Sequence, residues 1–252
     1  MRVRASIVVT ASFALALAAG AAFAQDQPAA AAPAAADTAK KPAAKPAAKS
    51  GTAAHATVDA AVKAIDAQIA KNAADKKDPN WKTKLKMPTL VKFDPAKSYY
   101  ARMVTNKGEM LIKLKPDLAP FHVTNYIYLT RLGFYDGTIF HRVMKGFMMQ
   151  GGDPLGRGTG GPGYNFNAEI SPKGIHNAPG VLSTANTGQP GSDGSQFFIM
   201  FKAYPQLDGG YTVFGQVEEG METLKAIEAV ANPGDGPPTE PVKLVKMTIE
   251  VK

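Results

Sequence analysis

The residues from position 98 to the C-terminus fall into short runs of alternating apolar and polar positions, with Gly, Pro or Asn between the runs. Such alternation over four to eight residues predicts half-buried β-strands. The last run is the clearest, because every second residue from Val245 to Val251 is apolar and the residues between them are polar. The pattern predicts eight strands, at 99–105, 109–114, 138–144, 147–149, 181–184, 195–200, 212–217 and 242–251.

Two segments among these runs have helical spacing instead. One begins at Pro120, which suits the first turn of a helix, and ends at Gly133, which can take a left-handed conformation. The other spans about 222–231. Together these elements predict a mainly β fold, a closed eight-stranded antiparallel barrel with two capping helices, because closure leaves no exposed strand edge.

A further helix is predicted before this region, over about 57–74. Its apolar residues recur at intervals of three and four along one face, at Val58, Val62, Ile65 and Ile69. This face can pack back on the main domain, or it can contact a partner or a second copy of the chain. Trp81 lies in a lysine-rich connector, and we expect it to anchor that connector to the domain.

The first 24 residues have the form of a secretory signal peptide. Arg2 and Arg4 precede a run of uncharged, mostly apolar residues, and Ala22 and Ala24 form a small-residue cleavage site. We expect cleavage after Ala24, a periplasmic or secreted bacterial protein, and no stable membrane insertion of the mature chain. The alternative is a retained anchor, since an uncharged run of this length could just span a bilayer.

Residues 25–54 consist mainly of Ala, Pro and Lys. They hold too few large side chains to bury the apolar area that would offset chain entropy, so we predict a disordered spacer. The chain then divides into a signal peptide (1–24), a spacer (25–54), a helical extension with its connector (55–97) and a globular domain (98–252).

Charge and composition exclude several classes of function. The net charge of +8 arises entirely before residue 98, because fourteen Lys and Arg balance fourteen Asp and Glu after it. A neutral domain argues against nucleic acid as a partner. The chain has no cysteine and only four His, none in a metal-binding pair, so we expect neither a metal ion nor a cofactor. The glycine-rich run 156–161 matches a dinucleotide-binding pattern, but Pro162 follows it and prevents the required helix.

Four blocks of sequence carry a more specific signal. They are 140–153 (FHRVMKGFMMQGGD), 180–186 (GVLSTAN), 193–198 (DGSQFF) and 207–217 (LDGGYTVFGQV). In this order they resemble the cyclophilin family of peptidyl-prolyl cis-trans isomerases, and the resemblance covers about 98–251. It implies the family's eight-stranded barrel with two helices, and rotation about X-Pro bonds as the activity.

That chemistry needs no nucleophile, since no bond breaks. Rotation about a peptide bond faces a barrier of ~18–20 kcal/mol, and a catalyst must stabilise the twisted amide, whose nitrogen regains a lone pair. A fixed cationic donor can bond to this nitrogen, and guanidinium is always charged and rigid. Arg142 is the catalytic candidate, as the resemblance also implies.

The resemblance implies a binding groove around Arg142. The proline ring would sit in an apolar pocket, and amide side chains would hold the substrate backbone; the residues are Phe147, Met148, Gln150, Ala185, Asn186, Gln196, Phe198, Leu207 and Tyr211. Gln196 and Phe198 are two positions apart on one strand and therefore share a face. Phe140 and Phe197 are expected to pack elsewhere.

The chain departs from many eukaryotic members at two positions. Gln206 stands where they have Trp, and Tyr211 stands where they have His. Tyr211 still offers a ring and a hydroxyl, so catalysis should survive. Gln206 lacks the indole donor and its apolar surface, so we expect weak cyclosporin binding.

The leading interpretation is an isomerase that speeds folding of exported proteins, with proline-containing unfolded or flexible polypeptides as partners. A second is a non-catalytic, proline-binding chaperone of the cell envelope. A third is an interaction protein that works through residues 55–97. The presence of Arg142 favours the enzyme, because a pure binder has little use for a cation aimed at the amide nitrogen.

Overall fold

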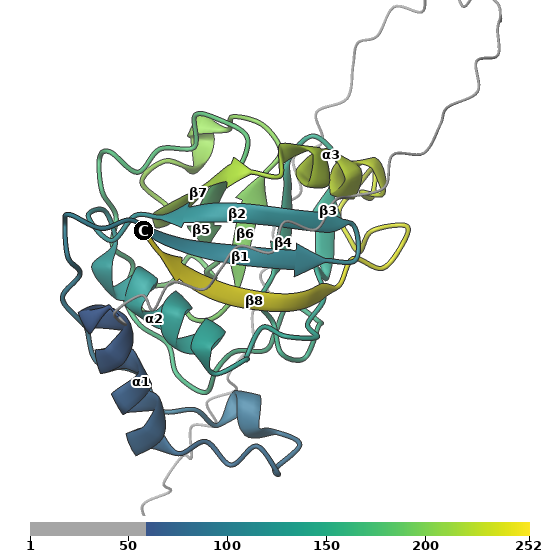
Figure 1. Ribbon diagram of the computed structural model, residues 1–252. Coiled ribbons are helices and arrows are strands. Elements are labelled where there is room, and N and C mark those ends of the chain that lie inside the picture. Colours follow the sequence, from purple (N-terminus) through teal and green to yellow (C-terminus); the bar gives the residue numbers. More distant parts are fainter. Residues whose placement is uncertain (1–58) are drawn as a thin grey trace, which may run out of the picture. The chain divides into compact units, whose positions relative to one another are not determined.

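One antiparallel sheet of eight strands forms the centre of the described part of the chain (Figure 1). The computed structural model describes residues 59–252, so the signal peptide and spacer predictions lie outside the described residues. The strand order is β3-β4-β6-β5-β7-β2-β1-β8. The strands are β1 (Tyr99–Thr105), β2 (Gly108–Leu114), β3 (Arg142–Met144), β4 (Met148–Gly151), β5 (Val181–Thr184), β6 (Phe197–Met200), β7 (Val213–Glu219) and β8 (Leu244–Val251).

The prediction of a closed barrel was wrong, because the sheet is a half-barrel that stays open between β3 and β8. The outer edge of β3 is occupied by a loop: Val143 donates its N–H to the carbonyl of Gly236, and Asn232 donates to the carbonyl of Val143. The proline-rich residues 237–241 lie between this loop and β8, and proline cannot donate to a ladder. The residues just before β3 and the start of β8 are joined by the isolated bridge of Ile139 to Lys243 and by backbone hydrogen bonds beside it, such as that from Phe140 N–H to the carbonyl of Val242, whereas β3 and β8 stand at opposite ends of the strand order.

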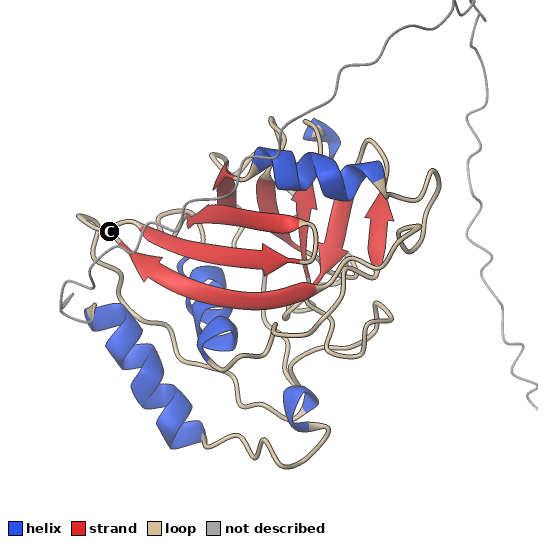
Figure 2. Cartoon of the chain, turned by 45° about the vertical axis from the view of Figure 1, so that its right-hand side comes forward, coloured by secondary structure: helices blue, strands red, loops and turns tan. Residues whose placement is uncertain are grey.

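Helices α2 (Pro120–Arg131) and α3 (Met221–Ala229) lie on opposite sides of the curved sheet (Figures 1 and 2). Pro120 occupies the first turn of α2, as predicted, and Gly133 follows its end with a φ of 72°. Every residue of α2 from 122 to 130 is buried. A helix buried all round needs a neighbour on the side away from the sheet.

Helix α1 (Ala60–Asn72) is that neighbour, and it packs against α2. Ile65 is fully buried in the main core. The guanidinium of Arg131 in α2 donates two hydrogen bonds, of 2.9 and 2.6 Å, to the carboxylate of Asp66 in α1. Of the two alternatives for the apolar face, the structure therefore shows packing on the domain.

The connector after α1 also lies against the domain. It includes a short 3-10 helix, η1 (Trp81–Thr83), and Trp81 packs partly buried against the core, as predicted. The Lys76 and Lys82 ammonium groups lie 5.4 and 5.8 Å from the centre of the Trp81 ring. Leu85 donates its backbone N–H to the carbonyl of Pro162, which ties the connector to the glycine-rich loop.

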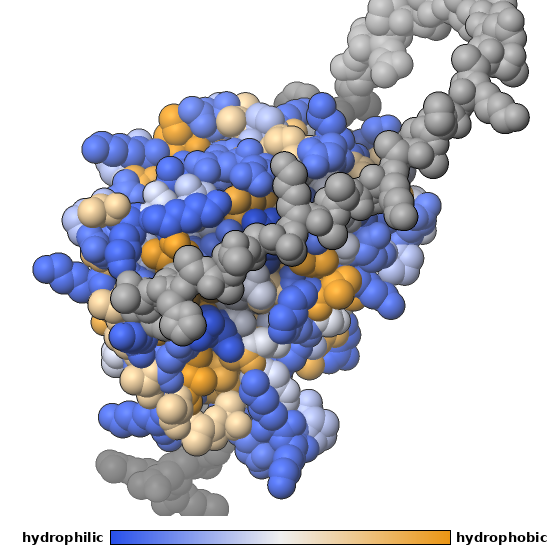
Figure 3. All heavy atoms as spheres, in the orientation of Figure 1, coloured by the Kyte–Doolittle hydropathy of each residue, from blue (hydrophilic) through white to orange (hydrophobic). Residues whose placement is uncertain are grey.

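Within residues 59–252, no helix is both long enough and apolar enough to cross a membrane. The face drawn in Figure 3 shows apolar residues as small patches among hydrophilic ones.

Candidate active site

Strand pairing places three of the predicted site residues side by side. Arg142 of β3 lies opposite Gln150 of β4, and Gln150 lies opposite Phe198 of β6. Directly opposed residues share one face of an antiparallel sheet. A guanidinium, an amide and a phenyl ring are therefore neighbours.

These side chains border a small cavity of about 90 Å³. Nine of the ten predicted residues line it: Arg142, Phe147, Met148, Gln150, Ala185, Asn186, Phe198, Leu207 and Tyr211. The tenth, Gln196, lines an adjoining cavity of about 110 Å³ that shares Gln150, Ala185 and Asn186 with the first. The structure thus brings together all the residues that the sequence singled out.

The alternation of β6 gives the cavity its apolar floor. Phe197 and Ile199 point into the main core, whereas Phe198 and Met200 belong to a second apolar cluster on the other face. Tyr211 packs edge-on against Phe198, with ring centroids 5.5 Å apart. An apolar floor of this kind suits a saturated ring. Phe140, like Phe197, lies in the main core, which confirms the expectation for both.

Arg142 is held by a residue that sequence reasoning missed. Its Nε and Nη2 donate to the two carboxylate oxygens of Asp235, at 2.5 and 2.9 Å, and its Nη1 lies 3.4 Å from Oε1 of Gln150. The hydrogen bonds from Arg142 lower the pKa of Asp235 below its ordinary value. Asp235 lies in a Gly- and Pro-rich loop, where Asp usually indicates only a turn, so no sequence signal distinguished it.

The two glutamines connect the site to the glycine-rich loop. Gln150 donates from Nε2 to Oε1 of Gln196 (2.9 Å), and Gln196 donates to the carbonyls of Gly158 and Gly160 (3.0 and 2.9 Å). The carboxylate of Asp153 accepts backbone N–H groups of the same loop, including that of Gly158. Burial raises the pKa of Asp153, but these N–H groups outweigh burial and lower it overall. The loop is therefore tied to the site by hydrogen bonds.

A hydrogen-bonded row of Ser183, His176 and Asp208 lies next to Phe198, which is part of the apolar floor. Nε2 of His176 lies 2.8 Å from Oγ of Ser183, and Nδ1 of His176 lies 2.9 Å from Oδ1 of Asp208. This is the order of a hydrolase triad, but Ser183 and His176 are both 0% exposed, so no substrate reaches the hydroxyl. His176 instead stacks on Phe198, and its backbone N–H donates to the carboxylate of Asp208, which follows Leu207 in the chain. These contacts position Phe198 and Leu207, two residues that line the cavity.

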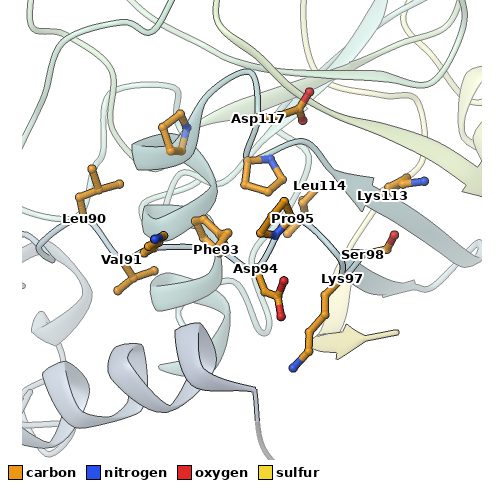
Figure 4. A pocket seen from close by; sticks show the side chains of 13 residues that line it. Leu90, Val91, Phe93, Asp94, Pro95, Lys97, Ser98, Lys113, Leu114 and Asp117 are labelled. Atoms are coloured by element: carbon orange, nitrogen blue, oxygen red, sulfur yellow. The ribbon is translucent and has the colours of Figure 1, made fainter.

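A larger cavity, of about 690 Å³, lies elsewhere on the domain (Figure 4). The connector, the end of β2 and the start of α2 line it, with Leu90, Phe93 and Pro95 among its apolar residues. None of the predicted site residues contributes to it. Volume alone does not make a catalytic site, so the smaller cavity that contains Arg142 is kept as the candidate site. Across residues 59–252, no cluster of His, Asp or Glu is arranged to hold a metal ion.

The sheet and the cavity together define a class of protein. It is a β domain in which one arginine lies beside a small apolar cavity, and no exposed nucleophile lines that cavity. Residues 100–249 match the family described as "Cyclophilin type peptidyl-prolyl cis-trans isomerase/CLD". The chain belongs to this family, and it is a peptidyl-prolyl cis-trans isomerase of the cyclophilin type.

Relatives from distant organisms share this region. The chain is 47% identical over 149 residues to peptidyl-prolyl cis-trans isomerase CYP18-1 of Arabidopsis thaliana, covering 58% of this chain and 92% of that protein. It is 41% identical over 177 residues to peptidyl-prolyl cis-trans isomerase B of Streptomyces anulatus, covering 62% and 99%. A crystal structure of a Cryptosporidium parvum cyclophilin type isomerase superposes with a TM-score of 0.58 at 36% identity, covering 61% and 98%.

Proposed function

We propose that the chain accelerates X-Pro rotation by stabilising the twisted amide with Arg142 while the apolar cavity holds the proline ring. Arg142 is one-third exposed at the edge of the cavity, so its remaining N–H groups can reach a bound peptide. Loss of amide resonance makes the proline nitrogen an acceptor, and a guanidinium bonded to it lowers the barrier.

The polar residues around Arg142 have the complementary task of fixing the substrate backbone. Gln150, Asn186 and Gln196 line the junction of the two adjoining cavities. If they hold the residue before proline while Phe198 and Leu207 hold the ring, rotation is confined to the bond between them. The observation that carries the proposal is the register that places Arg142, Gln150 and Phe198 in one row.

Isomerisation of a short Ala-Pro peptide, followed by NMR exchange with the full chain, tests this function. The related Cryptosporidium parvum protein was crystallised in the presence of the dipeptide Ala-Pro, which makes it a reasonable probe. Acceleration is expected. Peptide binding without acceleration would instead favour the non-catalytic chaperone.

We also propose export as the setting of this activity. The basic, apolar and small-residue regions of residues 1–24 support it, and clients would then be exported polypeptides with slow X-Pro steps. N-terminal sequencing of the protein recovered from cells should begin at Gln25. A chain that begins at its initiator Met and stays with the membrane fraction would support the retained anchor instead.

A further inference from the structure

A buried histidine outside the proline cavity is bonded to two carboxylates. His122, in the first turn of α2, is only 2% exposed. Its Nδ1 lies 2.6 Å from Oε2 of Glu169, and its Nε2 lies 2.8 Å from Oδ2 of Asp193. The same Glu169 carboxylate accepts the backbone N–H groups of Phe121 and His122, so it also caps the helix.

The geometry fixes the number of protons in this cluster. A neutral imidazole has one donor nitrogen and one acceptor nitrogen, and an ionised carboxylate can only accept. Both ring nitrogens face carboxylate oxygens, so both contacts are hydrogen bonds only when the cluster carries one proton more than a neutral imidazole with two ionised carboxylates. The other rings that pack on His122, those of Phe166 and Phe214, are uncharged, so Glu169 and Asp193 are the charged groups that face it.

The cluster is connected to the active site through Asp193. Gly194, Ser195 and Gln196 follow directly, and all three line the cavity next to the proline cavity. Asn125, one turn along α2 from His122, donates to the carbonyl of Gly194 at 2.9 Å. Helix α2 therefore holds the start of this segment at two points, and Gln196 at its end is bonded to Gln150.

We propose that His122 is a positioning residue for the isomerase site. Its doubly hydrogen-bonded imidazolium holds residues 193–196 in place, so that loss of one proton from the cluster as the pH rises lowers kcat/KM. After that loss, a nitrogen lone pair and a carboxylate oxygen face each other across a hydrogen-bond distance without a proton between them. The inference rests on the mechanism proposed above, since it concerns the alignment of Gln196 and Gln150 beside Arg142.

The direction of the proton equilibria agrees with this geometry. Burial disfavours the imidazolium, but the hydrogen bonds to Asp193 and Glu169 outweigh burial and raise the pKa of His122 above its ordinary 6.5. Burial raises the pKa of Glu169, but its hydrogen bonds from His122 and the α2 backbone lower it overall. A base with a raised folded-state pKa contributes stability that is complete below its ordinary pKa and is lost as the pH rises through the folded value. The contribution of His122 to stability is therefore lost as the pH rises above 6.5.

The test compares the pH profile of kcat/KM for the parent chain, Asp193→Asn and Asp117→Asn. In Asp193→Asn, the new amide can donate to the Nε2 of a neutral His122, so the cluster no longer needs its extra proton. Asp117→Asn removes an exposed carboxylate just before the same helix and leaves the cluster intact. Urea unfolding at pH 7 verifies that each variant is folded, and NMR of the His122 ring follows its proton directly.

We expect kcat/KM of the parent and of Asp117→Asn to fall roughly tenfold at pH values above the midpoint of the His122 ring titration. A small misplacement of groups at a catalytic site can lower the rate by up to about 100-fold. Asp193→Asn should lack this fall in kcat/KM. In this variant, the pH midpoint of the His122 ring titration should be lower than in the parent. His141, beside Arg142, cannot produce the effect, because burial lowers its pKa and it titrates on the acid side of 6.5.

The same fall in kcat/KM as the pH rises, in both Asp193→Asn and the parent, would overturn the inference alone, as would a His122 ring that titrates at or below 6.5. A parent chain without acceleration at any pH would overturn the proposed mechanism, and the inference with it.

Discussion

The carboxylate of Asp235 accepts two hydrogen bonds from the guanidinium of Arg142, one from Nε at 2.5 Å and one from Nη2 at 2.9 Å. Paired bonds of this kind fix the plane of a guanidinium as well as its position. They leave Nη1 on the side of Gln150, at the edge of the cavity. Asp235 therefore orients the one cation that the proposed mechanism requires.

Replacing Asp235 with Asn should lower kcat/KM. The amide keeps the size of the side chain but can accept only one of the two hydrogen bonds, so Arg142 samples other orientations. We expect a loss of roughly three- to tenfold, about 0.7–1.4 kcal/mol of transition-state stabilisation, measured by NMR exchange on an Ala-Pro peptide.

Glu240→Gln is the matched control for this variant. It removes a carboxylate from the same loop region, where Glu240 pairs with Lys107 and not with Arg142. Its kcat/KM should equal that of the parent. An unchanged or higher rate in Asp235→Asn would mean that the carboxylate does not orient the arginine.

Leu207→Ala should weaken the proline pocket. Leu207 lies partly buried against the second apolar cluster, and truncation removes one wall of the cavity. We expect peptide affinity to fall about tenfold, or roughly 1.4 kcal/mol, in an NMR titration. Leu90→Ala is the control, because Leu90 is exposed at the larger cavity. An equal loss in Leu90→Ala would place peptide binding at that larger cavity instead.

The sequence could predict the strands, because alternation is a local pattern, whereas the candidate site residues came from the resemblance to the cyclophilin family. Strand parity alone assigns Gln196 and Phe198 to one face. The row of Arg142, Gln150 and Phe198 could not be predicted, since it depends on the pairing of β4 with β6, which are distant in the chain. Barrel closure was mispredicted for a related reason: a loop, rather than β8, covers the edge of β3. Asp235 and His122 make contacts between segments that are distant in the chain, and no local pattern records such contacts.

Ile65→Ala should destabilise the fold without changing the chemistry. Ile65 is 0% exposed in α1 and belongs to the main core, so truncation leaves a cavity beside α2. We expect a loss of about 2–5 kcal/mol in the free energy of unfolding, measured by urea denaturation. Lys63→Ala, on the exposed face of α1, should unfold like the parent. A parent-like stability of Ile65→Ala would show that α1 does not pack on the domain in solution.

Gln206→Trp should strengthen cyclosporin binding. Gln206 is exposed in a short 3-10 helix, η2 (Pro205–Leu207), next to a wall of the proline cavity. An indole would restore a donor and a large apolar surface at this position. Isothermal titration should give a weak parent complex and a tighter one for the variant. A submicromolar dissociation constant for the parent would refute the expectation.

The role of Arg142 is tested most directly by NMR exchange on an Ala-Pro peptide, with the parent, Arg142→Ala and Arg142→Lys compared at equal concentration. Arg157→Ala, which removes an exposed arginine from the glycine-rich loop, serves as the control. We predict that Arg142→Ala loses at least roughly tenfold in kcat/KM, about 1.4 kcal/mol, that lysine restores little of it, and that Arg157→Ala matches the parent. A folded Arg142→Ala that accelerates rotation as well as the parent would contradict the mechanism.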